Sequence, residues 1–347
     1  MFFPFMRTAK KKLKKLSSSD PRGETNFNGV ARKDVIGCYR LFLGREPESE
    51  AAVLEYMKTK DLSTLRNIFI GSAEFRDRVQ SSDLVQLPFL PLDLPKNTIE
   101  YDATPAQLVA CVAKIKKVWS HLGETKPHFS VLTHADFLPE NLAENLDAFW
   151  SSGEGEAANL AKMLNRYGFR DLADKVCVEY GCGVGRVSIG LAQRFSQIHC
   201  YDISPGHLSL ATQRAQDVGA TDLQTHLCTE NPLDPLEKCD FFFSRIVFQH
   251  NPPPVIFQLF KNALQSLNRE GVAIIQVPTY RIDYTYNIRE WLAAGDKLDM
   301  EMHCLPQHAI YSLISSEGCE LLEVREDGFT GYSHQFVSNT FVVWKRG

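Results

Sequence analysis

Three glycines at every second position directly follow an apolar run that carries an acid near its end. The run is Val176–Tyr180, the acid is Glu179, and the glycines are Gly181, Gly183 and Gly185. An apolar run, closely spaced glycines and then an amphipathic segment are typical of a buried strand, a tight turn and a helix start. Glycines let the backbone approach a ligand closely, and the first N–H groups of the helix face the same place. The stretch therefore predicts a site for a nucleotide-like ligand.

A second acid stands where the next strand of such a site is expected to end. Asp202 closes the strand predicted over 197–201 and follows Glu179 by 23 residues, which suits a carboxylate that accepts hydrogen bonds from ribose hydroxyls. A dinucleotide-binding loop needs its third glycine at the position that Arg186 occupies, so an NAD-dependent enzyme is disfavoured. No Gly-Lys-Ser/Thr sequence follows, which excludes a P-loop.

Strands and helices alternate after the glycine loop, and this order predicts an α/β fold with a doubly wound, mostly parallel sheet. Further strands are predicted over 223–227, 240–247 and 272–277, and helices over 187–195, 205–218 and 255–267. Two β-like runs, 321–325 and 340–344, have no helical pattern between them and predict an antiparallel C-terminal pair in a seven-stranded sheet. Ligands of such sheets bind at the carboxyl ends of the strands, near the topological switch point.

The segments before the glycine loop are predicted to be additions to this fold. The expected division is a basic flexible tail over 1–28, a small all-α domain over 29–80, a Pro-rich linker over 81–103, and the α/β domain over 104–347. A helical lid is expected to begin that last domain, over 104–172, with helices over 104–122 and 157–167 and, between them, an irregular stretch that runs to Asn145. Five lysines follow aromatic residues in the tail, so a disordered tail and contact with an anionic membrane surface both stay open.

Composition narrows the class of protein further. The 347 residues are 44% apolar and carry a net charge of −4, which allows two domains and disfavours nucleic acid as a partner. The nine cysteines show no zinc-ligand spacing and no Cys-x-x-Cys pair, so they predict reduced thiols, a cytoplasmic location and no metal site. No apolar run approaches the length of a transmembrane helix.

The glycine loop and the acids resemble two motifs of class I S-adenosylmethionine (SAM)-dependent methyltransferases. Glu-x-Gly-x-Gly-x-Gly resembles the first motif, whose backbone lies against the methionine part of SAM, and Tyr201–Ser204 resembles the second, whose acid holds the ribose. The resemblance covers roughly 149–345 and implies SAM as the cofactor and S-adenosylhomocysteine (SAH) as the product. It implies cofactor contacts from Glu179, Gly181, Gly183, Gly185, Asp202, Ile203, Ser152, Gly153, Thr229, Glu230, Ser244, Phe248 and Gln249.

Some of these contacts have specific expected roles. The segment around Ser152 and Gly153 is expected to cover the carboxylate end of SAM as a lid, with a helix-capping role for Ser152 as the alternative. Thr229 and Glu230 follow the third strand, where the family places a polar contact to adenine.

The stretch 240–253 resembles the Ser…Gln-His form found in methyltransferases that act on oxygen or carbon of small molecules and glycans. Ser244 stands where amino-methylating enzymes carry the Asn of their Asn-Pro-Pro-aromatic motif, so Asn251 is out of register for that chemistry. His250 is the first candidate for the base or for orienting the acceptor, and capping the next helix or touching the cofactor is the alternative. The candidate acceptor walls are Tyr280, Arg281, Tyr284 and His303, for which surface or packing roles also stay open.

The helical domain resembles one that recurs in bacterial surface-associated proteins and in enzymes of surface-glycan assembly, through the segments 39–47 and 71–75. The sequence therefore predicts a SAM-dependent methyltransferase that acts on a hydroxyl of a sugar, a glycan or another small molecule. A SAM-binding scaffold of a glycan-assembly complex, without turnover, is the alternative. The expected location is the cytoplasm, with peripheral contact to the inner face of the membrane through the tail.

Overall fold

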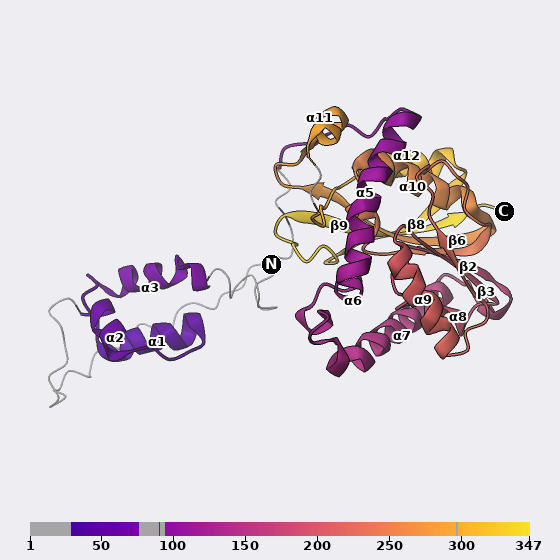
Figure 1. Cartoon of the computed structure of the whole chain (residues 1–347). Helices are drawn as coiled ribbons and strands as arrows, with labels where there is room; N and C mark the ends of the chain where they lie inside the picture. Colours follow the sequence, from indigo (N-terminus) through magenta and orange to yellow (C-terminus); the bar gives the residue numbers. More distant parts are fainter. Residues whose placement is uncertain (1–28, 76–89, 91–93, 296–297) are drawn as a thin grey trace, which may run out of the picture. The chain divides into compact units, whose positions relative to one another are not determined.

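The chain divides into two compact units, Met1–Gln86 and Leu87–Gly347 (Figure 1). The computed structural model describes residues 29–75, 90, 94–295 and 298–347. The predicted basic tail lies outside the described residues, and so does most of the predicted Pro-rich linker, at 81–89 and 91–93.

The described part of the first unit is a small helical bundle. It consists of α1 (Arg32–Leu43), α2 (Glu50–Tyr56) and α3 (Leu62–Ile70). Gly44 ends α1 in the left-handed conformation, with φ of 55°, which favours glycine. Tyr39 is fully buried and packs edge-on against Phe69, so an aromatic cluster forms the core of this unit. A helical turn follows Ser72 at 73–75, where the described residues of this unit end.

A seven-stranded sheet forms the centre of the second unit, in the order β4-β3-β2-β5-β6-β9-β8. Its first five strands along the chain are parallel, whereas β9 runs antiparallel to both of its neighbours, so the predicted sheet and its antiparallel C-terminal pair are confirmed. The strands are β2 (Val176–Tyr180), β3 (Gln197–Asp202), β4 (Leu223–Leu227), β5 (Cys239–Ser244), β6 (Leu267–Arg281), β8 (Cys319–Asp327) and β9 (Phe336–Lys345).

Helices cover both faces of this sheet, because its central strands are apolar on both sides. In β5, Phe242 packs into one core with residues of α5, α10 and α12, while Phe241 and Phe243 pack into a second core with α7 and α8. These helices are α5 (Pro105–Thr125), α7 (Leu142–Arg166), α8 (Ser188–Ala192), α10 (Pro253–Ser266) and α12 (Gln307–Ser316). The remaining long helix, α9 (Pro205–Asp217), packs on α5 and β4.

The helical lid differs from its prediction in one respect. Helix α7 begins at Leu142 and runs without a break through Ser152 and Gly153, so the predicted helix start at Ala157 and the helix-capping role of Ser152 are wrong. The helix tolerates Gly153 because this residue packs directly on the carbonyl group of Arg186, where any side chain would clash. Between α5 and α7, the sequence from 126 to 141 forms the short helix α6 (Pro127–Val131) and a single 3₁₀ turn, Ala135–Phe137.

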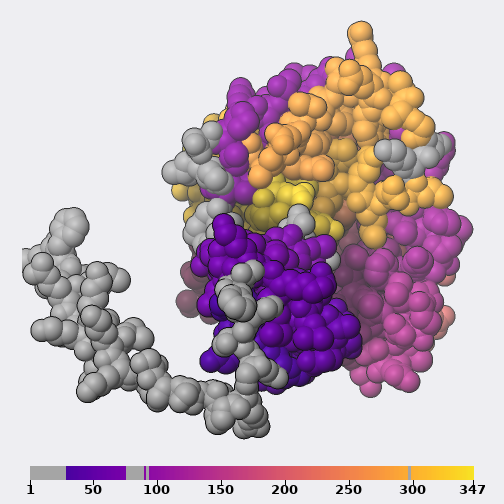
Figure 2. Space-filling view, turned by 90° about the vertical axis from the view of Figure 1, so that its left-hand side faces the viewer, coloured from indigo at the N-terminus to yellow at the C-terminus, as the bar shows by residue number. Residues whose placement is uncertain are grey.

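Two short elements join the start of this unit to its later loops. Strand β1 (Thr98–Ile99) pairs with β7 (Thr285–Tyr286), and α11 (Ile288–Ala293) follows directly. Figure 2 shows the α5 region and the α11 region side by side on one face, and Lys114 of α5 donates hydrogen bonds to two carbonyl groups at Trp291 and Ala294. Among the described residues, no helix has both the length and the hydropathy needed to cross a membrane.

Two glycines of this unit should respond to alanine in opposite ways. Gly123 of α5 lies against Ser204 at the start of α9, where a Cβ would clash, whereas Gly155 of α7 is exposed with open space around it. We expect Gly123→Ala to lower the free energy of unfolding by about 1–3 kcal/mol, and Gly155→Ala to raise it by about 0.5–1 kcal/mol. Urea unfolding followed by tryptophan fluorescence reports this unit alone, because it contains all four tryptophans. Equal effects of the two substitutions would contradict the close α5–α9 contact.

Candidate cofactor site

A pocket of the second unit lies at the carboxyl ends of the parallel strands, where the strand order reverses between β2 and β5. Its empty space, counted out into the open solvent at its mouth, is about 910 Å³. The lining comes from the ends of three strands and from α5, α6, α7 and α9. Its residues are Ile115, Trp119, Ser130, Val131, Glu156, Glu179–Gly183, Arg186, Val187, Asp202, Ile203, His207, Cys228, Phe243, Arg245–Val247 and Asn251.

Asp202 is held in the pocket by backbone groups on either side of it. Its carboxylate accepts a hydrogen bond from the N–H of Gly183 at 2.8 Å and another from the N–H of Ser204 at 2.9 Å. Each carboxylate oxygen offers about two lone-pair positions, so both retain acceptor capacity toward the pocket. The buried side chain is therefore fixed in place and suited to accept bonds from a pair of hydroxyl groups.

The glycine loop brings bare backbone to the pocket wall. Gly181 and Gly183 have φ of 79° and 56°, in the left-handed region that favours glycine. A side chain at Gly181 would clash with Val247, and one at Gly183 would clash with Val131 of α6. Gly185 faces Ala211 of α9 instead and does not line the pocket, so its close packing serves the fold.

Burial gives Glu179 unusual electrostatics. Only 5% of the residue is exposed, and this burial raises the pKa of its carboxyl to about 7, although the hydroxyl of Ser188 donates to it at 2.6 Å. The Ser188 bond and the nearby Arg186 guanidinium both act to lower the pKa, but desolvation outweighs them. Glu179 therefore links the end of β2 to the start of α8 and gains its charge near neutral pH.

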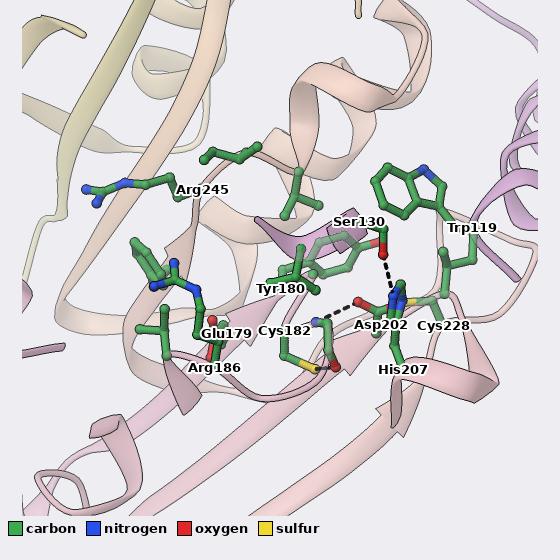
Figure 3. Close-up of a pocket in the computed structure, with 18 of the residues that line it drawn as sticks. Trp119, Ser130, Glu179, Tyr180, Cys182, Arg186, Asp202, His207, Cys228 and Arg245 are labelled. Atoms are coloured by element: carbon green, nitrogen blue, oxygen red, sulfur yellow. Dashed lines mark hydrogen bonds and ion pairs between the residues drawn. The ribbon is translucent and has the colours of Figure 1, made fainter. Parts of the chain in front are cut away.

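Two arginines and two acids share the end of the pocket away from His207 (Figure 3). Arg245 forms an ion pair with Glu156, and its guanidinium lies 4.3 Å from the centre of the Phe329 ring. Burial lowers the pKa of Arg186 and lowers that of Arg245 to about 10. In the described part of the chain, the Nε atoms of both arginines are buried without a hydrogen-bond partner. This end of the pocket suits a zwitterionic group that carries a carboxylate and an ammonium.

The opposite end of the pocket is closed by α6. The side-chain oxygen of Ser130 lies 2.8 Å from Nε2 of His207, whose Nδ1 lies 3.6 Å from the Asp202 carboxylate. His207 is buried beneath Trp119, with ring centroids 6.4 Å apart. The polar contact of α6 with α9 thus sits directly beside Asp202 (Figure 3).

The backbone is strained just after β5, the third strand whose end lines the pocket. Ile246 has φ of 58°, a rare conformation for a β-branched residue, two positions after β5 ends. The side chain of Gln276 accepts a hydrogen bond from its N–H at 2.8 Å and so holds this conformation. Such outliers persist where the surroundings impose them and are concentrated at ligand sites.

The pocket brings together five of the residues that the sequence singled out for the cofactor: Glu179, Gly181, Gly183, Asp202 and Ile203. Thr229 lines an adjoining pocket of about 580 Å³ that shares Tyr180, Ile203, Cys228 and Asn251 with the first, whereas Glu230 pairs with Lys116 at 3.1 Å.

The other residues predicted to contact the cofactor do not line the pocket. Ser152 accepts a hydrogen bond from Arg186, and Gly153 packs on the same residue, so both position this arginine. Ser244 donates to the carbonyl of Tyr180 and ties β5 to β2. Phe248 is a core residue, and Gln249 is buried in a network with Gln276.

His250 lies in a second, smaller pocket rather than in the first. Its Nδ1 donates to the carbonyl oxygen of Glu301 at 2.9 Å, and burial lowers its pKa to about 4, so the ring is neutral at pH 7. Helix α10 begins without a side-chain cap, which makes the helix-capping alternative for His250 wrong. His303 lines the same pocket and contacts the hydroxyl of Tyr284 at 2.7 Å. By contrast, Tyr280 bonds to the carbonyl of Pro95, and Arg281 packs over Phe336.

Several residues that line the pocket were not predicted as site residues from the sequence. Trp119, Ser130 and Glu156 come from the helical lid, and lid helices follow only the general apolar period. Arg186 stood within the motif, but it served there only to exclude a dinucleotide loop. Arg245 follows Ser244 directly and could have been proposed from its place at a strand end.

The raised pKa of Glu179 predicts a pH-dependent effect of Glu179→Gln. A folded-state pKa above the unfolded value adds stability below the unfolded pKa, and this stability is lost as pH rises through about 7. Relative to the native chain, the free energy of unfolding of Glu179→Gln should therefore improve by about 2 kcal/mol between pH 5.5 and 8.5. Urea unfolding at both pH values measures the change, with the exposed Glu140→Gln as control. A pH-independent difference would show that Glu179 titrates normally.

Solved structures with a similar fold include methyltransferases. Magnesium protoporphyrin IX methyltransferase from Synechocystis, with bound SAM, is 16% identical, with a TM-score of 0.45 over 67% of this chain and 97% of that one. A putative sarcosine dimethylglycine methyltransferase from Galdieria sulphuraria is also 16% identical, with a TM-score of 0.43 over 55% and 85% of the two chains. No curated protein matches the sequence.

One family model matches part of the second unit. The family described as a methyltransferase domain matches residues 177–271, which run from β2 through the glycine loop, Asp202 and β5 to β6. The matched segment contains the strand ends that form the pocket. This segment of the second unit is therefore similar to a methyltransferase domain, and most of the residues that line the pocket lie within it.

Proposed function

We propose that this chain transfers the methyl group of SAM to a hydroxyl group of a sugar, a glycan or another small-molecule acceptor. The observation that carries the proposal is the fixed carboxylate of Asp202, directed at the pocket beside the glycine loop. When bound, SAM would supply a methyl group on a positively charged sulfur; the acceptor oxygen bonds to that carbon, the electron pair of the broken carbon–sulfur bond stays on sulfur as SAH forms, and the hydroxyl proton passes to solvent.

The residues of the pocket fit the parts of SAM in order. Asp202 would accept both ribose hydroxyls, since its oxygens retain acceptor capacity after the two backbone bonds. Ile203 and Thr229 line the adjoining pocket on the adenine side. The Arg186 and Arg245 guanidiniums would face the carboxylate of the methionine part, and Glu156 or Glu179 its ammonium group.

The residues of this chain would contribute to the reaction in three ways. The lid helices α5 and α6 cover the loop, which excludes water and strengthens each charge contact inside. The indole of Trp119 borders both the cofactor pocket and the second pocket, so an acceptor can lie next to the methyl group. His250 is neutral at pH 7, because its pKa is far below 7. In this role it orients the acceptor through a hydrogen bond and does not keep the proton.

The hydroxyl acceptor follows from Ser244 in place of the asparagine of amino-methylating enzymes. A glycan context follows from the helical unit, whose segments 39–47 and 71–75 resemble a domain of surface-glycan enzymes. With the basic tail on an anionic membrane surface, the second unit would meet lipid-linked acceptors at the inner face of the membrane.

Cofactor binding is tested with Asp202→Asn. An amide places an N–H group against one of the backbone donors and loses the charge that strengthens the ribose bonds, so SAH should bind at least about 100-fold more weakly. Isothermal titration of SAH measures this affinity. The exposed Asp217→Asn, at the end of α9, is the matched control and should leave binding unchanged. Unchanged affinity in Asp202→Asn would contradict the proposed ribose contact.

Turnover is tested with labelled SAM. Incubated with a cell extract, the native chain should place the labelled methyl group on small molecules or glycans in a base-stable ether linkage, and Asp202→Asn should not. Tight SAH binding without incorporation would favour the scaffold function instead. Label in amines or nucleobases would contradict the hydroxyl acceptor.

A further inference from the structure

A second pocket of about 380 Å³ adjoins the cofactor pocket across the Trp119 side chain. It shares Ile115 and Trp119 with the first pocket, and no strand of the sheet contributes to it. Its lining comes from α5, the turn after β5, α11 and the loop before α12. These residues are Lys114, Ile115, Val118, Trp119, His250, Trp291, Asp299, Met300, Glu301 and His303.

Hydrogen bonds fix the walls of this pocket. The indole N–H of Trp291 donates to the carboxylate of Glu301 at 2.8 Å, and Nε2 of His303 lies 3.4 Å from the same carboxylate. The backbone carbonyl of Glu301 accepts from Nδ1 of His250. Glu301 thus connects the two imidazoles and the indole, and its side chain stays 39% exposed, which leaves it accessible to a ligand.

The charges of the pocket disfavour an anionic ligand. Among the described residues that line it, the cation is Lys114, which already donates to the carbonyls of Trp291 and Ala294 and whose ammonium lies 4.6 Å from the centre of the Trp291 ring. Asp299 and Glu301 add two negative charges to the same wall. A phosphate or carboxylate bound here would face these two acids, while the ammonium group of Lys114 is already bonded to the two carbonyl groups.

Shape and chemistry favour one small ring with several hydroxyls. The indoles of Trp119 and Trp291 offer apolar surfaces, and the carboxylate of Glu301 offers an acceptor between them. A pyranose has apolar C–H faces and equatorial hydroxyls at its edge, which matches both kinds of wall. The empty space of this pocket, about 380 Å³ including its opening to solvent, is smaller than that of the cofactor pocket.

We propose that this second pocket binds the methyl acceptor as a single uncharged sugar ring, packed on Trp291 and hydrogen-bonded to Glu301; this rests on the proposed function. Trp119 borders both pockets, and one hydroxyl of the ring would reach past its edge to the methyl group of the cofactor. Trp291 and Glu301 therefore determine acceptor specificity, while neither lines the cofactor pocket.

Fluorine NMR of the full chain labelled with fluorotryptophan can test this pocket without turnover. The four tryptophans report on different places: Trp291 on the second pocket, Trp119 on both pockets, and Trp150 and Trp344 on neither lining. The probes are methyl glucopyranoside, methyl mannopyranoside, methyl rhamnopyranoside, a hexose phosphate and glucosamine, each with and without SAH. At least one neutral glycoside should shift the Trp291 signal, and Trp344 should not move.

Glu301→Gln should weaken this glycoside about tenfold, because the ligand loses a hydrogen bond to a charged group. Glu290→Gln, exposed on α11, should leave its affinity unchanged. No Trp291 shift with any neutral glycoside, or tighter binding of the hexose phosphate or glucosamine, would overturn the inference. A missing response of Trp119 to SAH would instead contradict the cofactor function, so the two failures are distinguishable.

Discussion

The constraint on which the site depends is the attachment of the glycine loop to the end of β3. The N–H groups of Gly181 and Cys182 both donate to the carbonyl of Tyr201, at 2.7 and 3.0 Å, and the N–H of Gly183 donates to the Asp202 side chain. Three consecutive loop residues are thus bonded to two consecutive strand residues. Side chains at Gly181 and Gly183 would clash with Val247 and Val131, so the loop has one arrangement and one set of neighbours.

The other parts of the pocket are arranged around this attachment. Val131 of α6 packs on Gly183, and Ser130 contacts His207 of α9, so the lid closes over the same two strand ends. The charged groups at the far end are partly buried in an apolar wall, which raises the pKa of Glu179 and lowers that of Arg245. A zwitterionic ligand would relieve this cost of burial, because each buried charge would gain an opposite partner.

The sequence was sufficient for the parts of the fold with strong local signals. The β2 strand, the glycine loop and Asp202 were predicted because an apolar run, glycine spacing and a strand-terminal acid are local patterns. The lid was harder to predict. Helix α7 continues through a Ser-Ser-Gly sequence that reads as a break, and only the contact of Gly153 with Arg186 explains it. Trp119 and Trp291 meet at a pocket although they lie far apart in the chain, so no local pattern could pair them.

The most direct measurement is a crystal structure of the full chain with SAH. We expect both ribose hydroxyls within about 3.2 Å of the Asp202 carboxylate. The adenine should lie beside Ile203, and the amino-acid end beside Arg186 and Arg245. The sulfur should lie on the side of the pocket that Trp119 borders. SAH bound in the reverse direction, or bound away from Asp202, would contradict the account.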